Sequence, residues 1–165
     1  MNRLVLAVSI ATMAVGCSSG AAPTAAPAQT PSPTLALLAR GNFHLGGHLS
    51  DRQIELEAAG SGPNVTGSMH TADGTEIYDV DLECSKTTES GLLMVGGNVI
   101  NSTTEYAPED TWAGIVLKPG SPAEGTIVLQ LDDPKMPTCL EFLDQMIGFG
   151  EPVLEPIEGT LELGP

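Results

Sequence analysis

The fold is decided by residues 77–84, which read IYDVDLEC. From Tyr78 onward, apolar and acidic side chains alternate strictly in this stretch, so a β-strand here has two different faces. Alternation of this kind is typical of an antiparallel sheet that is buried on one side and wet on the other. The face predicted to point inward carries Tyr78, Val80, Leu82 and Cys84.

The same period of two recurs on both sides of this stretch, in short segments separated by Gly, Pro, Asn and Asp. In residues 53–58, for example, Ile54, Leu56 and Ala58 share one face. Turns of hairpin length, such as Asp73-Gly74, join the segments. The predicted strands are residues 42–48, 53–58, 65–72, 77–84, 91–100, 111–117, 126–131 and 157–163.

Eight short strands of this type predict an all-β domain. The favoured architecture is a small antiparallel eight-stranded barrel, and a two-sheet sandwich is the alternative. Two glycine pairs, Gly46-Gly47 and Gly96-Gly97, favour the barrel because glycine permits the sharp bends that tight curvature needs.

One segment breaks the strand rhythm. Residues 139–147 read CLEFLDQMI, in which apolar residues recur at the three- and four-residue spacing of a helix. Thr138 stands directly before this segment and is the predicted N-cap. We therefore expect one short helix near the C-terminus.

The first residues have the pattern of a bacterial lipoprotein signal peptide. Arg3 precedes an apolar run that is too short to cross a membrane, which takes roughly 20 residues. Residues 14–17, AVGC, resemble a lipobox, although Ala14 stands where leucine is usual. The resemblance implies cleavage before Cys17 and acylation of its thiol. The alternative is an ordinary secretory signal, cut at a small-residue site such as Ala22.

The predicted organisation has three parts. Residues 1–16 form the lipoprotein signal peptide, 17–39 form a lipidated, Ala/Pro/Ser/Thr-rich disordered tether, and 40–165 form the all-β domain. Residues 35–39 are either a helical turn or the first part to dock on the domain. Two acyl chains, such as palmitate, hold a protein stably on a bilayer. We therefore expect a lipid-anchored protein on the extracytoplasmic face of the cell membrane.

The two remaining cysteines, Cys84 and Cys139, predict a disulfide, because an exported location is oxidising. The bridge would close a loop of roughly 55 residues. The inward position of Cys84 on its strand fits a buried bridge. Two buried thiols are the alternative.

The composition restricts the partners. Asp and Glu number 21 against 6 Lys and Arg, for a formal net charge of −15, and removal of residues 1–16 would take away Arg3 and no acid. Nucleic acid needs clustered cations, so it is not an expected partner. Anionic lipid headgroups are disfavoured for the same reason, which leaves membrane attachment to the acyl chains.

Signatures of catalysis are missing from the sequence. It contains neither a Gly-x-Ser-x-Gly elbow nor a phosphate-binding loop. His44 and His48 lie too far apart along one strand to share a zinc ion without a sharp bend. The acids of residues 79–83 are best interpreted as a solvated strand face. We predict neither enzymatic activity nor a cofactor.

The order of several segments resembles secreted all-β domains of actinobacteria: IELEAAG, VDLEC, VGGNVI, WAGIVLKPGSP and IVLQL, within residues 41–131. The Ala/Pro/Thr-rich tail after the lipobox is similar to that of mycobacterial-type lipoproteins. Residues 118–122, KPGSP, lack the Asp-Asn pair common at this point in those domains. The resemblance implies a β domain and carries no site residues with it.

These observations lead to one main functional hypothesis: a membrane-anchored cell-envelope lipoprotein whose β domain is a non-enzymatic binding module for an envelope protein or a lipid. The alternative is a carrier that holds a lipid or a small apolar ligand in a barrel cavity. Candidate ligand contacts are the large side chains of Trp112, Tyr106 and Met94, which lie near glycine bends. For Trp112, core packing is the competing interpretation.

Overall fold

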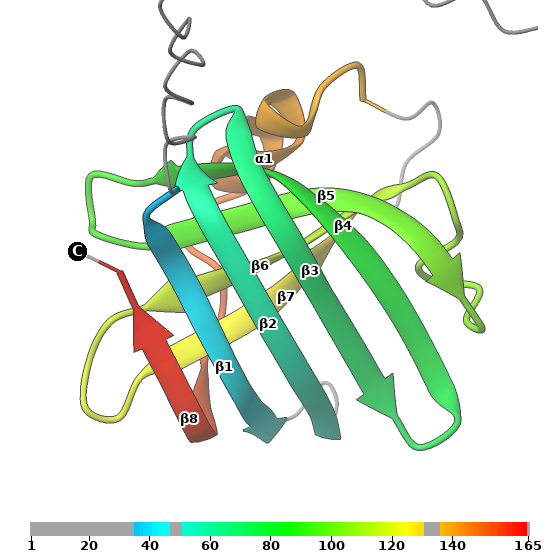
Figure 1. Cartoon of the computed structure of the whole chain (residues 1–165), viewed down its shortest axis with the longest axis horizontal. Helices are drawn as coiled ribbons and strands as arrows, with labels where there is room; N and C mark the ends of the chain where they lie inside the picture. Colours follow the sequence, from blue (N-terminus) through cyan, green and yellow to red (C-terminus); the bar gives the residue numbers. More distant parts are fainter. Residues whose placement is uncertain (1–34, 47–50, 131–135, 165) are drawn as a thin grey trace, which may run out of the picture. The chain divides into compact units, whose positions relative to one another are not determined.

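A computed structural model describes residues 35–46, 51–130 and 136–164. Eight antiparallel strands follow one another in chain order around a closed barrel, and the last strand pairs with the first (Figure 1). The all-β prediction, the barrel and the single short helix are confirmed, and the sandwich alternative is wrong. The elements are β1 (Leu37–Gly46), β2 (Asp51–Ser61), β3 (Asn64–Asp73), β4 (Glu76–Thr87), β5 (Leu93–Ser102), β6 (Trp112–Lys118), β7 (Glu124–Leu129), α1 (Cys139–Gly148) and β8 (Glu155–Leu163).

Each predicted strand overlaps one observed strand. The barrel begins at Leu37, inside the segment that the sequence assigns to the tether, because Ala39 is fully buried and pairs with both Ala58 and Leu163. Residues 34–165 form a compact unit of their own. Residues 1–34, which include the predicted signal peptide and Cys17, lie outside the described residues, as do Gly47, His48 and Leu131.

The inside of the barrel is filled with side chains. The inward face predicted for β2 is confirmed, since Ile54, Leu56 and Ala58 are all buried. Bulky residues from six strands meet along the axis, so the interior is a packed core of the kind expected for eight strands. The largest fully buried side chains of this core are Tyr78, Phe43, Ile54, Met69, Leu82, Ile115 and Leu117.

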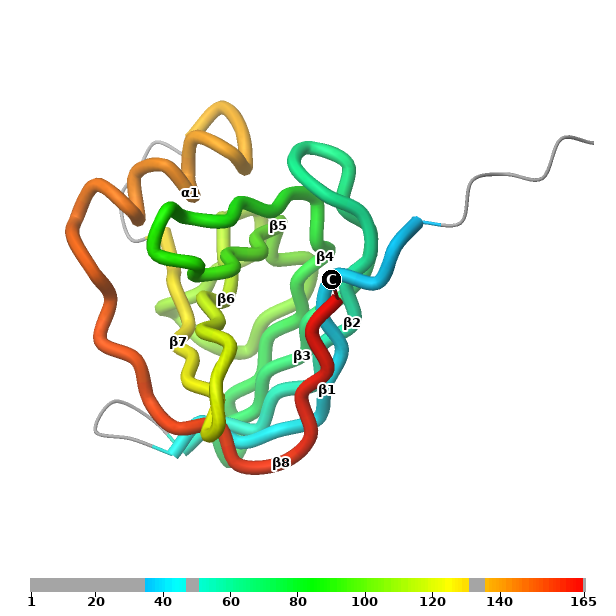
Figure 2. The backbone as a smooth tube through the Cα atoms, turned by 90° about the vertical axis from the view of Figure 1, so that its left-hand side faces the viewer, coloured from blue at the N-terminus to red at the C-terminus, as the bar shows by residue number. Residues whose placement is uncertain are grey.

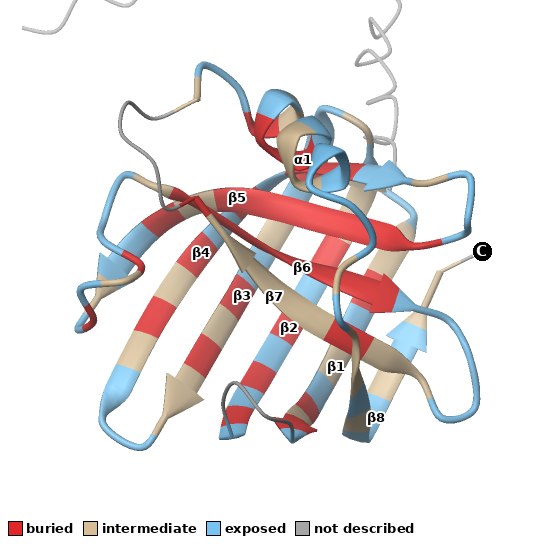
Figure 3. Ribbon diagram, turned by 180° about the vertical axis from the view of Figure 1, so that it is seen from behind, coloured by how far each residue is buried: buried red, intermediate tan, exposed pale blue. Residues whose placement is uncertain are grey.

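Residues 93–97 of β5 and 112–117 of β6 are buried on both faces, as the red parts of these strands in Figure 3 show. Alternate residues point into the barrel and out of it: Ile115 joins the barrel core, whereas Val116 packs with Phe142 and Leu143 of α1. The helix covers this outer wall, and the chain after it runs outside β7 before it joins β8 (Figure 2). We call this second cluster the helix core, which consists of Cys84, Leu92, Met94, Trp112, Val116, Cys139, Phe142 and Leu143.

The Cys84–Cys139 disulfide is confirmed, with an S–S distance of 2.02 Å. The inward orientation predicted for Cys84 is wrong. A break in the register lies between Leu82 and Cys84, which pair with Gly97 and Gly96 on β5. A bulge of this kind puts an extra residue on one strand and turns the next side chain to the other face. Leu82 therefore points into the barrel core, and Cys84 points out into the helix core.

The glycine pair on β5 has a packing role at this point. A Cβ atom on Gly97 would lie 1.9 Å from the carbonyl oxygen of Asp81, so only glycine permits the approach of β4. A Cβ atom on Gly96 would lie 3.1 Å from Leu143 Cδ2 and 3.4 Å from Cys139 Sγ. The pair lets the helix and its disulfide sit close against the barrel wall.

The predicted N-cap of α1 is also confirmed. Thr138 has extended backbone angles, and its hydroxyl accepts a hydrogen bond of 3.2 Å from the backbone N–H of Glu141. We expect Thr138→Ala to lower the free energy of unfolding by about 1 kcal/mol, because a helix N–H loses its acceptor. Thr138→Ser, which keeps the oxygen, is the control in a urea titration. Equal losses for both substitutions would contradict a capping role.

Candidate binding sites

Three hollows of different chemistry lie on the described part of the barrel domain. The first, the sheet face, is about 770 Å³ in volume and lies across the outside of β8, β1, β2 and β3. The second, the helix groove, is about 560 Å³ and runs beside α1. The third, the mouth pocket, is about 440 Å³ and opens where the β3–β4 turn, the β5–β6 connection and β7 approach each other.

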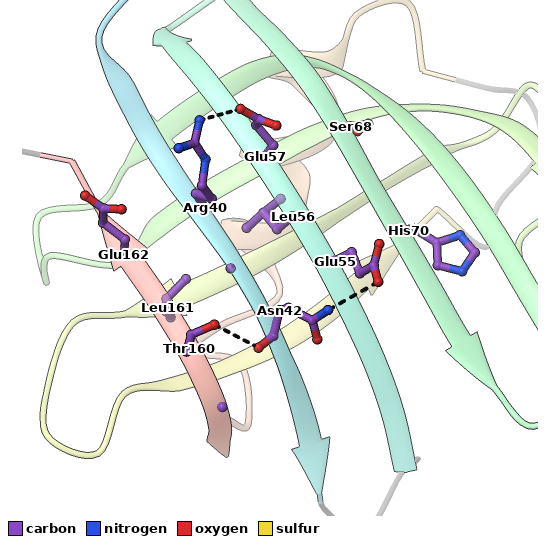
Figure 4. A pocket seen from close by; sticks show the side chains of 12 residues that line it. Arg40, Asn42, Glu55, Leu56, Glu57, Ser68, His70, Thr160, Leu161 and Glu162 are labelled. Carbon is purple, nitrogen blue, oxygen red and sulfur yellow. Dashed lines mark hydrogen bonds and ion pairs between the residues drawn. The ribbon is translucent and has the colours of Figure 1, made fainter.

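The sheet face is polar, and its side chains pair with one another (Figure 4). Arg40 forms an ion pair of 2.5 Å with Glu57, and the Asn42 amide donates to Glu55 at 3.2 Å. The Arg40–Glu57 pair is more than half exposed on each side, and exposed pairs of this kind contribute about 0–1 kcal/mol. This face has the features of a solvated outer surface.

His44 and His70 lie on the outer side of the barrel. His70 Nδ1 lies 2.5 Å from Asp79 Oδ1, while Asn101 donates to the other oxygen of Asp79 at 2.8 Å. Burial raises the pKa of Asp79, but these two partners lower it by more, so the net shift is downward. His44 pairs with Asp51. No group of three or more His, Cys, Asp or Glu within the described ranges is arranged to hold a metal ion.

The helix groove is largely apolar. It lies between α1, the β4–β5 turn and the outer side of β6 and β7, and Lys86 at its edge pairs with Asp144 of the helix. Its apolar walls are Leu92, Met94, Val116, Val128, Met146 and Ile147. The segment that follows α1 in the chain carries exposed apolar side chains: Phe149 is 73% exposed and Val153 is 76% exposed.

The three candidate ligand residues are not brought together. Trp112 is buried in the helix core, and its indole N–H donates to the carbonyl of Met136 at 2.8 Å, in line with the core-packing interpretation. Met94 lines the helix groove. Tyr106 lines the mouth pocket, a different hollow.

The mouth pocket exists because β7 and β8 separate. Among the described residues these strands pair only at Glu124 with Pro156 and at Gly125 with Glu155. The rest of β7 is left without β8 beside it, and Ile127 and Leu129 line the opening. The other lining residues are Leu45, Arg52, Asp73, Glu76, Tyr106, Thr126 and Glu155.

Arg52 is the central polar residue of this pocket. Its Nη2 donates to the Tyr106 hydroxyl at 2.6 Å, and that hydroxyl donates to Glu76 at 2.9 Å. The guanidinium also lies 3.9 Å from Asp73, and its carbon is 4.9 Å from the centre of the Tyr106 ring. With only 9% of its surface exposed, this arginine is held in a fixed position.

Sequence reasoning missed Arg52, although a signal was present. Arg52 lies two positions before Ile54. Because every second residue of a strand faces the same way, Arg52 shares the inward face of β2 with Ile54, Leu56 and Ala58. A cation at an inward position is unusual and marks a functional candidate.

Tyr78 lies next to this network. It is fully buried, its ring meets Tyr106 edge-on with centroids 6.4 Å apart, and Arg52 lies 5.9 Å from its ring centre. Within the described part of the chain its hydroxyl has no hydrogen-bond partner. Burial raises the pKa of Tyr78 to about 12 and outweighs the nearby Thr71 hydroxyl and Arg52 charge, which act in the opposite direction.

This raised pKa predicts a loss of stability at alkaline pH. Between the ordinary tyrosine pKa of 10.0 and about 12, the unfolded chain releases the Tyr78 proton and the folded chain keeps it. The free energy of unfolding therefore falls as the pH rises through this range. We expect Tyr78→Phe to remove this part of the pH dependence, as measured by denaturation at a series of alkaline pH values. An unchanged slope would contradict the assignment.

No known protein family, curated protein or solved structure matches this chain. The class of protein is therefore defined by the fold: a closed eight-stranded antiparallel barrel with a disulfide-linked helix on its outer wall. In the residues that the structure describes, no helix has the length and apolar character that a membrane crossing requires.

Proposed function

We propose that this chain is a membrane-anchored lipoprotein of the cell envelope, of the actinobacterial type, and that its barrel is a non-enzymatic binding module. The observation that carries the binding role is the helix groove with its exposed apolar border. The anchor rests on the sequence AVGC at residues 14–17. Two acyl chains on Cys17 would keep the domain at the extracytoplasmic face of the cell membrane.

The exposed apolar side chains support this assignment because they are concentrated in one segment. Of the five exposed large hydrophobic residues in the described ranges, Ile147, Phe149 and Val153 fall within residues 147–153. Single exposed apolar residues are normal on a protein surface, whereas a group beside a hollow is typical of a contact site. In protein interfaces a few residues, clustered in a well-packed region, carry most of the binding energy.

The groove also has the rigidity that a docking site needs. One wall belongs to α1, and the Cys84–Cys139 disulfide ties the first residue of that helix to β4. A groove that is formed before the partner arrives avoids the entropy cost of ordering it during binding. The partner best suited to this surface is an envelope protein that presents apolar side chains, and a lipid acyl chain is the second possibility.

The carrier alternative receives less support in its original form. A barrel carrier needs an internal cavity of at least about 300 Å³, and here the axis is occupied by residues such as Tyr78, Phe43 and Met69. A ligand would have to bind in the helix groove or the mouth pocket instead. We therefore place the binding role on the outside of the barrel.

The proposal is tested by site-specific photo-cross-linking in intact cells. A photoreactive phenylalanine analogue at position 149 is expected to give a discrete adduct with a membrane-associated partner. The same analogue at Ile100, which is also exposed but lies on β5 away from the groove, is the matched control. Cys17→Ser is expected to move the protein out of the membrane fraction and to abolish the adduct. Equal adducts at positions 149 and 100 would contradict the binding role.

A further inference from the structure

The mouth pocket has chemistry of its own, separate from the helix groove and from the anchor. We infer that it is a second binding site, for a small ligand that carries an ammonium group on a short apolar body. Its volume of about 440 Å³ is within the range of small-molecule sites, which is roughly 300–1,000 Å³. Its lining divides into an apolar wall and an acidic rim.

The apolar wall suits an alkyl or aryl body. Leu45 comes from the end of β1, and Ile127 and Leu129 come from the part of β7 that β8 leaves uncovered. Ile127 and Leu129 are only partly buried in the protein, so a ligand can remove more of their apolar surface from water. Each such contact contributes roughly 25 cal/mol per Å² of apolar surface.

The charges around the pocket favour a cation. Three carboxylates, from Asp73, Glu76 and Glu155, line it against the single guanidinium of Arg52. Arg52 lies over the Tyr106 ring, so that aromatic face is taken and a ligand cation would be bound by the carboxylates. The formal charge of −15 on the whole chain acts in the same direction. An anionic ligand would meet a net negative rim.

A second, independent observation is a group of buried polar side chains behind the pocket lining. Arg52, Thr71 and Tyr78 are buried side by side at this end of a core that is otherwise apolar. The buried Tyr78 hydroxyl lacks a hydrogen-bond partner among the described residues, and burying a polar group in this way costs stability. Tyr78 does not line the pocket itself but packs against Arg52 and Tyr106, which do. An arrangement that opposes folding is expected next to a binding site.

The test compares three probes with the same eight-carbon chain: octylammonium, octanol and octanoate. The protein is the chain from position 17 onward with Cys17→Ser, which retains every described residue and carries no acyl group. Titration calorimetry is expected to show octylammonium binding about ten-fold more tightly than octanol, with octanoate weakest. The NMR signals of the Leu45, Ile127 and Leu129 methyl groups are expected to shift, whether or not those of the helix groove also shift.

Paired substitutions test the role of the rim. Asp73→Asn with Glu76→Gln is expected to remove the preference for octylammonium and to leave octanol binding unchanged. Asp81→Asn with Glu83→Gln removes the same charge from exposed positions of β4 that do not line the pocket, and is expected to change neither. If the first variant does not fold, the salt dependence of probe binding to the unsubstituted chain is measured instead. Added salt is expected to weaken the binding of octylammonium and to leave the binding of octanol unchanged.

Equal affinity for octylammonium and octanol, preference for octanoate, or no measurable binding would each overturn the inference. Shifts confined to the helix groove would also overturn it. These outcomes are independent of the cross-linking result at position 149, because the probes report on the mouth pocket and the cross-link reports on the groove.

Discussion

Replacing both Cys84 and Cys139 by alanine is expected to lower the free energy of unfolding by about 4 kcal/mol. The two residues are 55 positions apart in the sequence, and the bridge removes the freedom of that loop from the unfolded chain. Both sulfur atoms are buried in the helix core, so the disulfide also holds α1 on the outer wall of the barrel.

The measurement is a urea titration of both proteins, with and without a reducing agent. Reduction is expected to destabilise the unsubstituted chain by a similar amount and to have no effect on the double variant, which serves as its own control. A double variant as stable as the unsubstituted chain would show that the loop is already constrained by other means, and the role given to the bridge would be wrong.

Phe142→Ala is expected to cost about 3–5 kcal/mol, the usual loss for truncating a buried aromatic residue. Phe142 is fully buried between α1 and the barrel wall, and its ring lies close to Gly96 on β5. Alanine would leave a cavity that the helix, tied to β4 by the disulfide, is poorly placed to fill.

Phe149→Ala is the matched control, because the same side chain is removed seven positions later where it is 73% exposed. This change is expected to alter stability by no more than about 0.5 kcal/mol. The two variants are compared by denaturation in the same buffer. Similar losses for both would mean that the helix core does not carry the stability assigned to it.

Much of the fold could be predicted from the sequence because each face of the sheet has a clear pattern. The period of two in residues 77–84 and its repeats located all eight strands, and the change to helical spacing located α1. The disulfide was predicted from the number of cysteines together with an expected exported location, and it is present. The strands and the helix depend on local sequence, so they are visible without a structure.

The orientation of Cys84 could not be predicted, because the alternation of residue types runs unbroken through the bulge between Leu82 and Cys84. The sequence places the start of β1 at Asn42 instead of Leu37 for the opposite reason: residues 35–39 are apolar without alternation, although a strand begins among them. The mouth pocket depends on tertiary structure. It brings Arg52, Glu76 and Tyr106 together from three parts of the chain, and only closure of the barrel shows that they meet.

The most direct test of the central claim, a binding module tethered to the membrane, is the intact mass of the protein isolated with detergent from its own cells. We predict a chain that begins at Cys17, carries two acyl chains, and gains the mass of two hydrogen atoms when the Cys84–Cys139 disulfide is reduced. A chain without acyl groups that begins after a small-residue site such as Ala22 would contradict the account, because the barrel would then be a freely secreted domain.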